Sequence, residues 1–239
     1  MMYRANDPLS FHPDNPATWP SFRPLMIAHD VGCSRDRSTA VVGGPSPLQR
    51  QVLGIAELVE LPQGLFGSQR ANALAVVDRH YNSDALIIAD LSYDPTYAEV
   101  LHQTFGPRVI GLHIGRSGDG MTLERRQVSR NAVVLVYTIG RSYLLEMFHT
   151  RLQAGRVRMV DNPMSQRAYE QLVALETEMR ESGTIYKCAS GQHDDLGISC
   201  AMLAWAARHP HLEPWVRTGL AGRRPRMRGS EYGWGAFNR

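Results

Sequence analysis

Hydrophobic positions recur with two different spacings along this chain, and the spacings predict both strands and helices. Short apolar runs at residues 25–31, 39–44 and 51–60 are joined by brief connections, which predicts three sequential antiparallel strands. Between residues 69 and 81 the apolar positions lie three or four apart instead, which predicts a helix. Residues 85–90 form an apolar run that ends in an acid, the pattern of a buried strand.

The middle of the chain predicts a parallel crossover. Asp94 and Pro95 favour a helix start, and this helix is expected to run to about Phe105. Residues 109–114 then return as a strand, so the strand at 85–90, the helix and this strand should form a right-handed parallel unit. The remaining elements are expected as an inserted hairpin within 115–138 that includes an extended stretch at 131–137, a helix at 142–153, a strand at 156–160, an amphipathic helix at 165–180, an extended segment at 184–188 and a nearly all-apolar helix that begins at Asp194 or Asp195.

Length and composition indicate one globular domain. The chain has 239 residues, of which 43% are hydrophobic and 21% charged, an ordinary balance for a protein with one sizeable core. We expect this domain to span residues 24–210, between an irregular proline-rich lead-in at 1–23 and a flexible basic tail at 211–239. No stretch approaches the roughly 20 apolar residues that cross a bilayer, and the N-terminus lacks a signal-peptide layout, so we expect a cytoplasmic protein without a membrane partner.

Basic residues are nearly all arginine, and they cluster near the C-terminus. Lys187 is the only lysine among 26 basic residues. Genomic base composition can produce such a bias, so the clustering is more informative than the number. A flexible arginine-rich arm can follow a DNA backbone through phosphate contacts without reading sequence. The candidate DNA-binding residues are Arg217, Arg223, Arg224, Arg226 and Arg228.

Acidic residues occupy the ends of two predicted strands. Asp30 ends the first strand and Asp90 the fourth, so both carboxylates emerge at one edge of the sheet if these strands are parallel neighbours. Asp194 and Asp195, at the start of the last helix, would bring a further carboxylate there. Each acid taken singly is also typical of a turn or of a helix N-cap. Converging carboxylates need a counter-charge, and oxygen-only ligands select Mg²⁺ or Mn²⁺, two of which about 4 Å apart can hydrolyse a phosphodiester bond.

The order of these elements is the layout of a ribonuclease H-like fold, an α/β fold in which three antiparallel strands are followed by parallel strands and helices flank the mixed sheet. Within that layout, several segments resemble the nuclease domain of the large subunit of phage DNA-packaging terminases, and the resemblance extends from about residue 25 to residue 207. The His-Asp-Asp-Leu element is its most specific part. The segments are Ile27-Ala28-His29-Asp30 with Asp36-Arg37-Ser38-Thr39-Ala40-Val41, Ile87-Ile88-Ala89-Asp90, Tyr137-Thr138-Ile139-Gly140-Arg141-Ser142-Tyr143-Leu144-Leu145, and His193-Asp194-Asp195-Leu196.

The resemblance implies a two-metal-ion DNA endonuclease that hydrolyses concatemeric phage or prophage DNA during packaging, in the cytoplasm of a bacterial host cell. It implies that the catalytic acids Asp30, Asp90 and Asp194 or Asp195 bind two Mg²⁺ or Mn²⁺ ions, and it leaves the choice within the last pair open. The partners that it implies are double-stranded DNA, a separate packaging ATPase, a small terminase subunit and a portal.

One departure from the family concerns the ATPase. Large terminases usually carry one, and its phosphate-binding loop needs a glycine directly before a lysine. Here Tyr186 precedes Lys187, the only lysine, so we expect a nuclease module, a split terminase half that needs a separate ATPase, or a remnant. The alternatives are a Holliday-junction resolvase or a ribonuclease H-like repair nuclease, and, outside the enzymes, a non-catalytic remnant that binds DNA or a portal.

Overall fold

The computed structural model describes residues 26–32, 37–45, 51–81, 85–115, 118–180, 183–187 and 194–212. The strands are β1 (Met26–Asp30), β2 (Thr39–Pro45), β3 (Leu53–Glu60), β4 (Leu86–Asp90), β5 (Val109–Gly115), β6 (Asp119–Ser129), β7 (Ala132–Gly140), β8 (Val157–Met159), β9 (Glu176–Arg180) and β10 (Gly183–Lys187). The helices are α1 (Gly67–His80), α2 (Tyr97–Phe105), α3 (Arg141–Gln153), α4 (Pro163–Val173) and α5 (Asp195–Ala206), with a short 3-10 helix, η2, at Gly106–Arg108.

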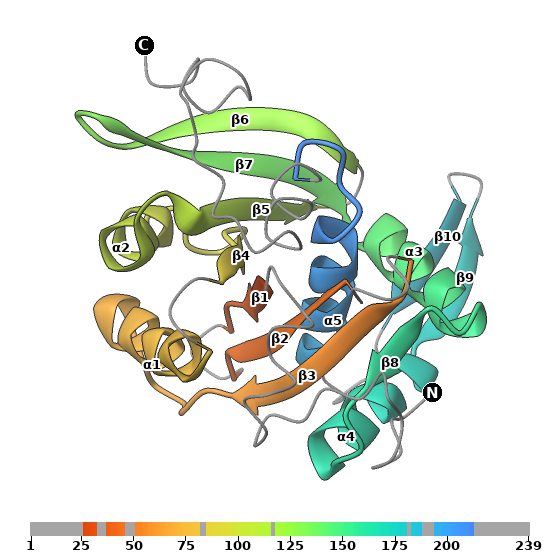
Figure 1. Cartoon of the computed structure of the whole chain (residues 1–239). Helices are drawn as coiled ribbons and strands as arrows, with labels where there is room; N and C mark the ends of the chain where they lie inside the picture. Colours follow the sequence, from red (N-terminus) through yellow and green to blue (C-terminus); the bar gives the residue numbers. More distant parts are fainter. Residues whose placement is uncertain are drawn as a thin grey trace.

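Eight strands form one mixed sheet in the order β6-β7-β5-β4-β1-β2-β3-β8, and helices cover both of its faces (Figure 1). β1, β2 and β3 are antiparallel neighbours, whereas β1, β4, β5 and β7 run parallel. α1 and α2 pack on one face, and α3 and α5 pack on the other. The predicted mixed α/β sheet is therefore confirmed, and the first and fourth strands meet the condition, parallel pairing, on which a shared edge for Asp30 and Asp90 depends.

Side chains alternate between the two faces of the sheet, as the period of two along a strand requires. On β1, Met26 and Ala28 belong to the hydrophobic core shared with α3 and α5, whereas Ile27 belongs to the core under α1 and α2. All three side chains are fully buried. β1 is thus a central strand covered on both faces, which explains its unbroken apolar run.

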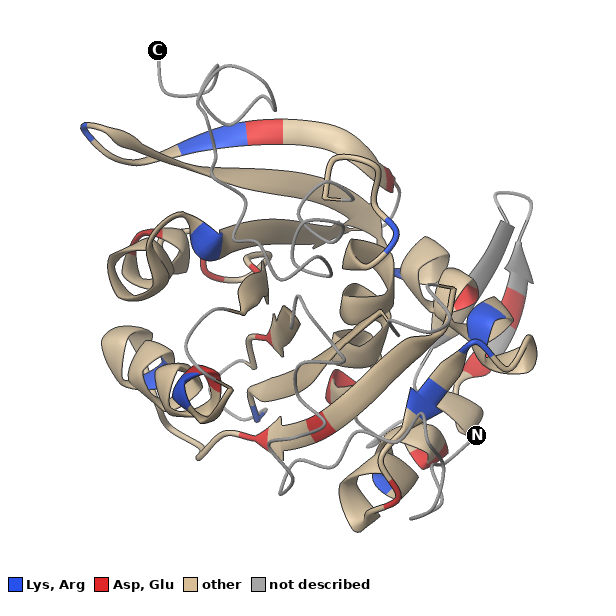
Figure 2. Ribbon diagram, in the orientation of Figure 1, with Lys and Arg blue, Asp and Glu red and all other residues tan. Residues whose placement is uncertain are grey.

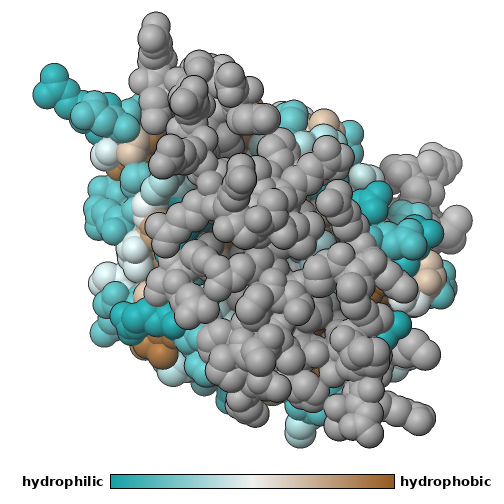
Figure 3. Space-filling view, viewed as in Figure 1, coloured by the Kyte–Doolittle hydropathy of each residue, from teal (hydrophilic) through white to brown (hydrophobic). Residues whose placement is uncertain are grey.

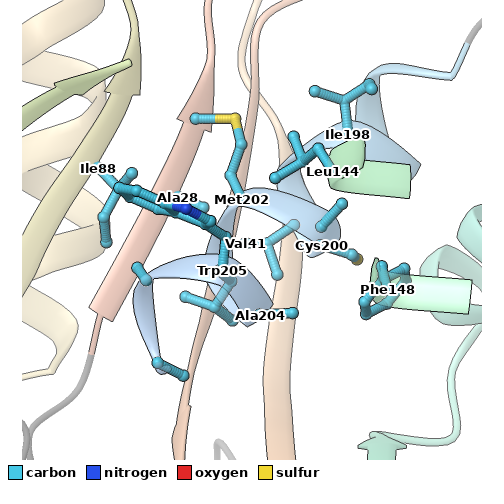
Figure 4. Close-up of a cluster of buried hydrophobic side chains, with 14 of the residues drawn as sticks. Ala28, Val41, Ile88, Leu144, Phe148, Ile198, Cys200, Met202, Ala204 and Trp205 are labelled. Carbon is cyan, nitrogen blue, oxygen red and sulfur yellow. The ribbon is translucent and has the colours of Figure 1, made fainter. Parts of the chain in front are cut away.

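Helix α5 has no solvent-facing side, since every residue after Asp195 is buried. Figure 4 shows its side chains between Val41 and Ile88 of the sheet and Leu144 and Phe148 of α3. Full burial of a large aliphatic or aromatic side chain stabilises a fold by roughly 1.5–3 kcal/mol. The contact of α5 with the sheet and α3 is therefore a main source of stability in this core.

Strand β2 approaches both β3 and α5 so closely at Gly43 that no larger residue fits. An added Cβ would lie 2.2 Å from the carbonyl oxygen of Gly54 and 2.8 Å from Cδ2 of Leu203. The register of β2 against β3 also shifts here, between Val42 and Gly43. Glycine therefore permits both the bulge and the seating of α5 on the sheet.

The helix predicted at 165–180 is wrong at both ends. α4 begins at Pro163, where the Asn162 side chain accepts a hydrogen bond of 2.8 Å from the Ser165 amide, and it ends at Val173. The following residues form β9, which pairs with β10 in an antiparallel hairpin. The helical spacing of the apolar residues continues past Val173, but strand pairing overrides it there.

The hairpin predicted within 115–138 consists of β6 and β7, yet it is not an insertion. β7 is hydrogen-bonded parallel to β5, so the hairpin extends the main sheet and β6 is its edge strand.

The helix predicted to open at Asp94 and Pro95 begins at Tyr97 instead. The Asp94 carboxylate accepts a hydrogen bond of 3.1 Å from the Thr96 amide, which closes a turn ahead of the helix.

The predicted lead-in at 1–23 and residues 213–239 of the predicted tail lie outside the described residues, so the proposed domain limits stay predictions.

In the view of Figure 3 the described surface is mainly hydrophilic, with a small hydrophobic patch over α1. None of the helices in the described ranges is both long and apolar enough to span a membrane.

A buried ion pair ties the end of α1 to the start of β5. Asp78 is 3% exposed and accepts hydrogen bonds from Nη2 (2.9 Å) and Nη1 (3.2 Å) of Arg108. Asp78→Asn leaves this partly buried guanidinium without its counter-charge, so we expect it to lower the free energy of unfolding by about 3 kcal/mol. Urea unfolding followed by circular dichroism measures this loss.

The matched control is Glu124→Gln, which removes the ion pair to Arg126 on β6. Glu124 is 59% exposed, and an exposed pair contributes less than about 1 kcal/mol. Equal losses for the two variants would contradict the structural role of Asp78.

Candidate functional site

Asp30 and Asp90 end adjacent parallel strands at the same edge of the sheet. His29 and Ala89 are register partners, and each aspartate is the next residue along its strand. Neighbouring strands lie about 4.8 Å apart, which sets the distance between the two backbones. Ala28 and Ile88, two residues earlier, both face the α5 core, so both aspartates emerge on the face that carries α5.

A buried histidine fixes the end of β1 just before Asp30. The His29 side chain is fully buried, and its Nδ1 donates to the carbonyl oxygen of Thr39 over 2.8 Å. The Tyr97 hydroxyl lies 3.4 Å from Nε2 on the other side of the ring. Burial lowers the pKa of His29 to about 4, with the nearby Arg70 contributing, so the ring is neutral at neutral pH. His29 therefore serves the structure of this edge from the face opposite α5.

Asp90 is a buried carboxylate held by a serine. Asp90 is 6% exposed. Its Oδ1 accepts hydrogen bonds from the Ser92 amide (2.9 Å) and from the Ser92 hydroxyl. The same hydroxyl oxygen accepts a bond of 2.7 Å from the Ile114 amide on β5. Burial raises the pKa of Asp90, and the bonds from Ser92 and the proximity of His113 only partly offset this. The ionised form of Asp90 is thus costly in the absence of a cation.

The start of α5 is tied to the same edge through Thr39, the register partner of Asp30 on β2. The Thr39 hydroxyl donates to the backbone carbonyl of Asp195 over 3.2 Å. Its oxygen also lies 2.7 Å from the Ser199 hydroxyl, which must then be the donor of that bond. These two contacts seat the first turn of α5 against β2, beside the strand that ends in Asp30.

Asp194 occupies the N-cap position of α5 but does not cap it. Its carboxylate forms an ion pair with Nη2 of Arg141, whose Nη1 donates to the Tyr186 carbonyl over 3.0 Å. The amide of Gly197 instead donates to the Gln171 side chain of α4 at 3.3 Å. The cap interpretation of Asp194 is therefore wrong for its side chain, because a nearby guanidinium competes successfully for the carboxylate.

The structure thus brings the backbones of three predicted acids, Asp30, Asp90 and Asp195, to one edge of the sheet. Within the described ranges, no three His, Cys, Asp or Glu side chains already form a metal-binding group. His193 and the tail arginines from Arg217 to Arg228 lie outside the described residues. The metal-binding role of the acids and the DNA-binding role of the tail stay predictions.

Comparison with known proteins finds likeness in structure alone. No protein-family model and no curated protein matches the sequence. The large terminase nuclease of thermophilic phage G20c is similar with a TM-score of 0.55 and 18% identity, over 78% of this chain and 84% of that one. The large terminase nuclease domain of bacteriophage SPP1, solved with bound Mn, has a TM-score of 0.52 and 12% identity, over 86% of this chain and 94% of that one.

This chain has the fold of a terminase nuclease domain. A second structure of the G20c nuclease contains bound magnesium and is similar with a TM-score of 0.54 and 18% identity, over 77% of this chain and 83% of that one. At these identities the likeness shows the terminase nuclease fold alone.

Two residues of this terminase-type fold were missed by the sequence analysis as parts of the site. Ser92 lies two residues after Asp90, the spacing of a side-chain-closed turn, and that spacing is a signal for it. Arg141 is the first residue of α3, where a positive charge opposes the helix dipole. A basic residue at that position indicates a partner elsewhere in the fold, although the sequence does not show that the partner is Asp194.

The buried carboxylate of Asp90 predicts a pH-dependent stability. Its folded-state pKa lies above the unfolded value, so its favourable contribution is present at low pH and is lost as the pH rises through the folded pKa. We expect Asp90→Asn to unfold at a higher urea concentration than the wild type at neutral pH without metal. This gain should shrink as the pH falls toward the ordinary carboxylate range.

The matched control is Asp161→Asn, an exposed acid just after β8, which should change the unfolding midpoint little at any pH. A gain for Asp90→Asn that is constant with pH would contradict a titrating carboxylate as its cause.

The ion pair of Arg141 and Asp194 predicts a second stability effect. The two side chains are 35% and 15% exposed, between the limits of a surface pair and a buried one. We expect Arg141→Gln to lower the free energy of unfolding by about 1–3 kcal/mol. In the double-mutant cycle with Asp194→Asn, the two losses should not add, and additive losses would show that the pair is not formed.

Proposed function

We propose that this chain is a metal-dependent DNA endonuclease of the terminase large subunit type. The observation that carries the proposal is the edge where Asp30 and Asp90 end neighbouring parallel strands beside the acidic start of α5. An α/β sheet with this strand order places its chemistry at that edge, where strands end and a helix begins. The terminase nuclease fold, seen with magnesium and with Mn in structural neighbours, supports the same assignment.

Asp30, Asp90 and Asp195 are the acids that we propose as metal ligands. Carboxylate oxygens are the donors that Mg²⁺ and Mn²⁺ prefer, and the buried Asp90 carboxylate makes no ion pair with Arg or Lys in the described part of the chain. Two bound ions would activate a water molecule and stabilise the leaving oxygen of a phosphodiester. Asp195 begins α5, and we propose it as the last ligand; Asp194 pairs with Arg141.

The surrounding residues would hold these ligands in place. Ser92 orients the Asp90 carboxylate through two hydrogen bonds, and Thr39 sets the position of the α5 backbone at Asp195. Arg141 neutralises Asp194, which lowers the repulsion among the acids at the start of α5.

The substrate and partners follow from the terminase-type proposal. The DNA would be concatemeric phage or prophage DNA, cut in a bacterial cell during packaging, with a separate ATPase, a small terminase subunit and a portal as partners. The predicted arginines at 217–228 would add contacts to the DNA backbone.

A cleavage assay with metal-site variants tests the proposal. Supercoiled plasmid and a synthetic four-way junction are incubated with Mn²⁺, with Mg²⁺ and with EDTA, and Mn²⁺ affinity is measured by titration calorimetry. We expect metal-dependent plasmid cleavage that Asp30→Asn, Asp90→Asn and Asp195→Asn reduce by about 100-fold or more, since even residues that only support ligands change metal affinity or activity by 10–100-fold. Asp194→Asn should retain Mn²⁺ binding.

Asp161→Asn is the matched control and should cleave like the wild type. Cleavage of the junction alone would replace the terminase proposal by a junction resolvase. Intact DNA with both metals, together with no Mn²⁺ binding, would exclude an enzymatic role and leave a domain that only binds DNA or a portal.

A further inference from the structure

A further acid on the edge of the proposed metal ligands is engaged by two arginines. Glu60 ends β3, and its Oε2 lies 2.6 Å from Nη1 of Arg37, just before β2. Its Oε1 lies 2.6 Å from Nη1 of Arg167 on α4. The Glu60 side chain is 13% exposed, whereas the two arginine side chains are 52% and 48% exposed. The carboxylate is thus shielded beneath two solvent-facing guanidinium groups.

This group lies in line with the proposed metal ligands. Thr39 is the register partner of both Asp30 and Glu60, so Glu60 is two strands away from Asp30 along the same edge. Two strand spacings amount to about 10 Å. Leu58, two residues before Glu60, faces the same core as α5, so Glu60 lies on the same face as Asp30 and Asp90.

The arginines of this group differ from Arg108, whose guanidinium has a structural role. The guanidinium of Arg108 donates hydrogen bonds to both carboxylate oxygens of Asp78 and to the Ala85 carbonyl, and only 21% of the Arg108 side chain is exposed. Arg37 and Arg167 each give one nitrogen to Glu60 as their contact within the described ranges. Half-exposed ion pairs add little to stability, so stability alone does not explain why Arg37 and Arg167 both contact Glu60.

Charge and chemistry suit these two arginines to phosphate. With one glutamate between them, the group has a net charge of +1, and each guanidinium keeps further N–H donors for a bidentate contact. Many of the other basic residues in the described chain are spread over α1, η2, α3, β6 and β8 (Figure 2). The strand register places the pair at Glu60 on the edge of the proposed metal ligands, where Arg141 is engaged by Asp194.

We propose that Arg37 and Arg167, oriented by Glu60, bind backbone phosphates of the DNA strand that passes the Asp30 and Asp90 edge. This inference rests on the proposed nuclease function. The separation of about 10 Å corresponds to roughly three nucleotides of one DNA strand along the helix axis. The contact positions the strand without reading its sequence, since phosphates are the same at every base.

The test measures binding of a short fluorescent DNA duplex by anisotropy, in EDTA so that no cleavage occurs, over a range of salt concentrations. The variants are Arg37→Gln, Arg167→Gln and the double variant. Each loss of a phosphate contact should make the slope of log K against log salt shallower by about 0.9, and the double variant by about twice that. Affinity at a fixed moderate salt concentration should fall several-fold for each replacement and further for both.

Arg79→Gln is the matched control, because Arg79 is exposed near the end of α1 on the opposite face of the sheet. It removes the same charge and should leave the slope near the wild-type value. Thermal unfolding of all variants checks that they fold. Slopes and affinities equal to those of the control would overturn the inference and assign Arg37 and Arg167 a structural role.

Cleavage by the wild type with Mn²⁺ separates this inference from the proposed function. In a cleaving enzyme the arginine variants should raise KM and leave kcat nearly unchanged, because they contact phosphates away from the reacting one. If the wild type cleaves DNA but the arginine variants bind DNA as tightly as it does, the phosphate site is excluded and the nuclease proposal stands. If DNA binding depends on the two arginines but no cleavage occurs, the nuclease proposal is excluded and the phosphate site stands.

Discussion

The packing of α5 against the sheet is the constraint on which the rest of this structure depends. The helix is buried on all sides, and its seat requires a glycine at position 43, where any side chain would meet Gly54 and Leu203. A helix held this firmly has one possible position for its first turn, and Thr39 bonds that turn to β2. The location of Asp195 relative to Asp30 is therefore a consequence of core packing.

Acids gather along the edge that this packing creates, and each is compensated differently. Asp194 pairs with Arg141, and Glu60 pairs with two arginines. Within the described residues, hydrogen bonds from Ser92 and from the Ile114 backbone and the nearby His113 support the charge of Asp90, yet burial raises its pKa. This contrast distinguishes acids that orient cations of the protein from an acid suited to an external cation. It also links function to a cost in stability, since a buried carboxylate destabilises the domain in the absence of metal.

Much of this architecture was predictable because its signals are local. The apolar runs that predict the strands ending in Asp30 and Asp90 each lie within a few residues, and the structure then pairs these two strands in parallel. Errors arose where a local pattern had to compete with distant partners. Residues after Val173 continue a helical spacing but pair as β9 with β10, and the 115–138 hairpin became part of the sheet because β7 pairs with β5.

The sequence by itself determined the mixed α/β sheet and the candidate acids at the ends of its first and fourth strands, because strand period and apolar burial can be recognised within a few consecutive residues. The tertiary structure alone decided that Asp194 meets Arg141 and that Glu60 joins Arg37 to Arg167. Those choices depend on side chains that are brought together by packing from more than 20 residues apart along the chain, as the separation of 23 between Arg37 and Glu60 shows. Adjacent aspartates look alike in a sequence, and only the fold shows that the Arg141 guanidinium reaches Asp194.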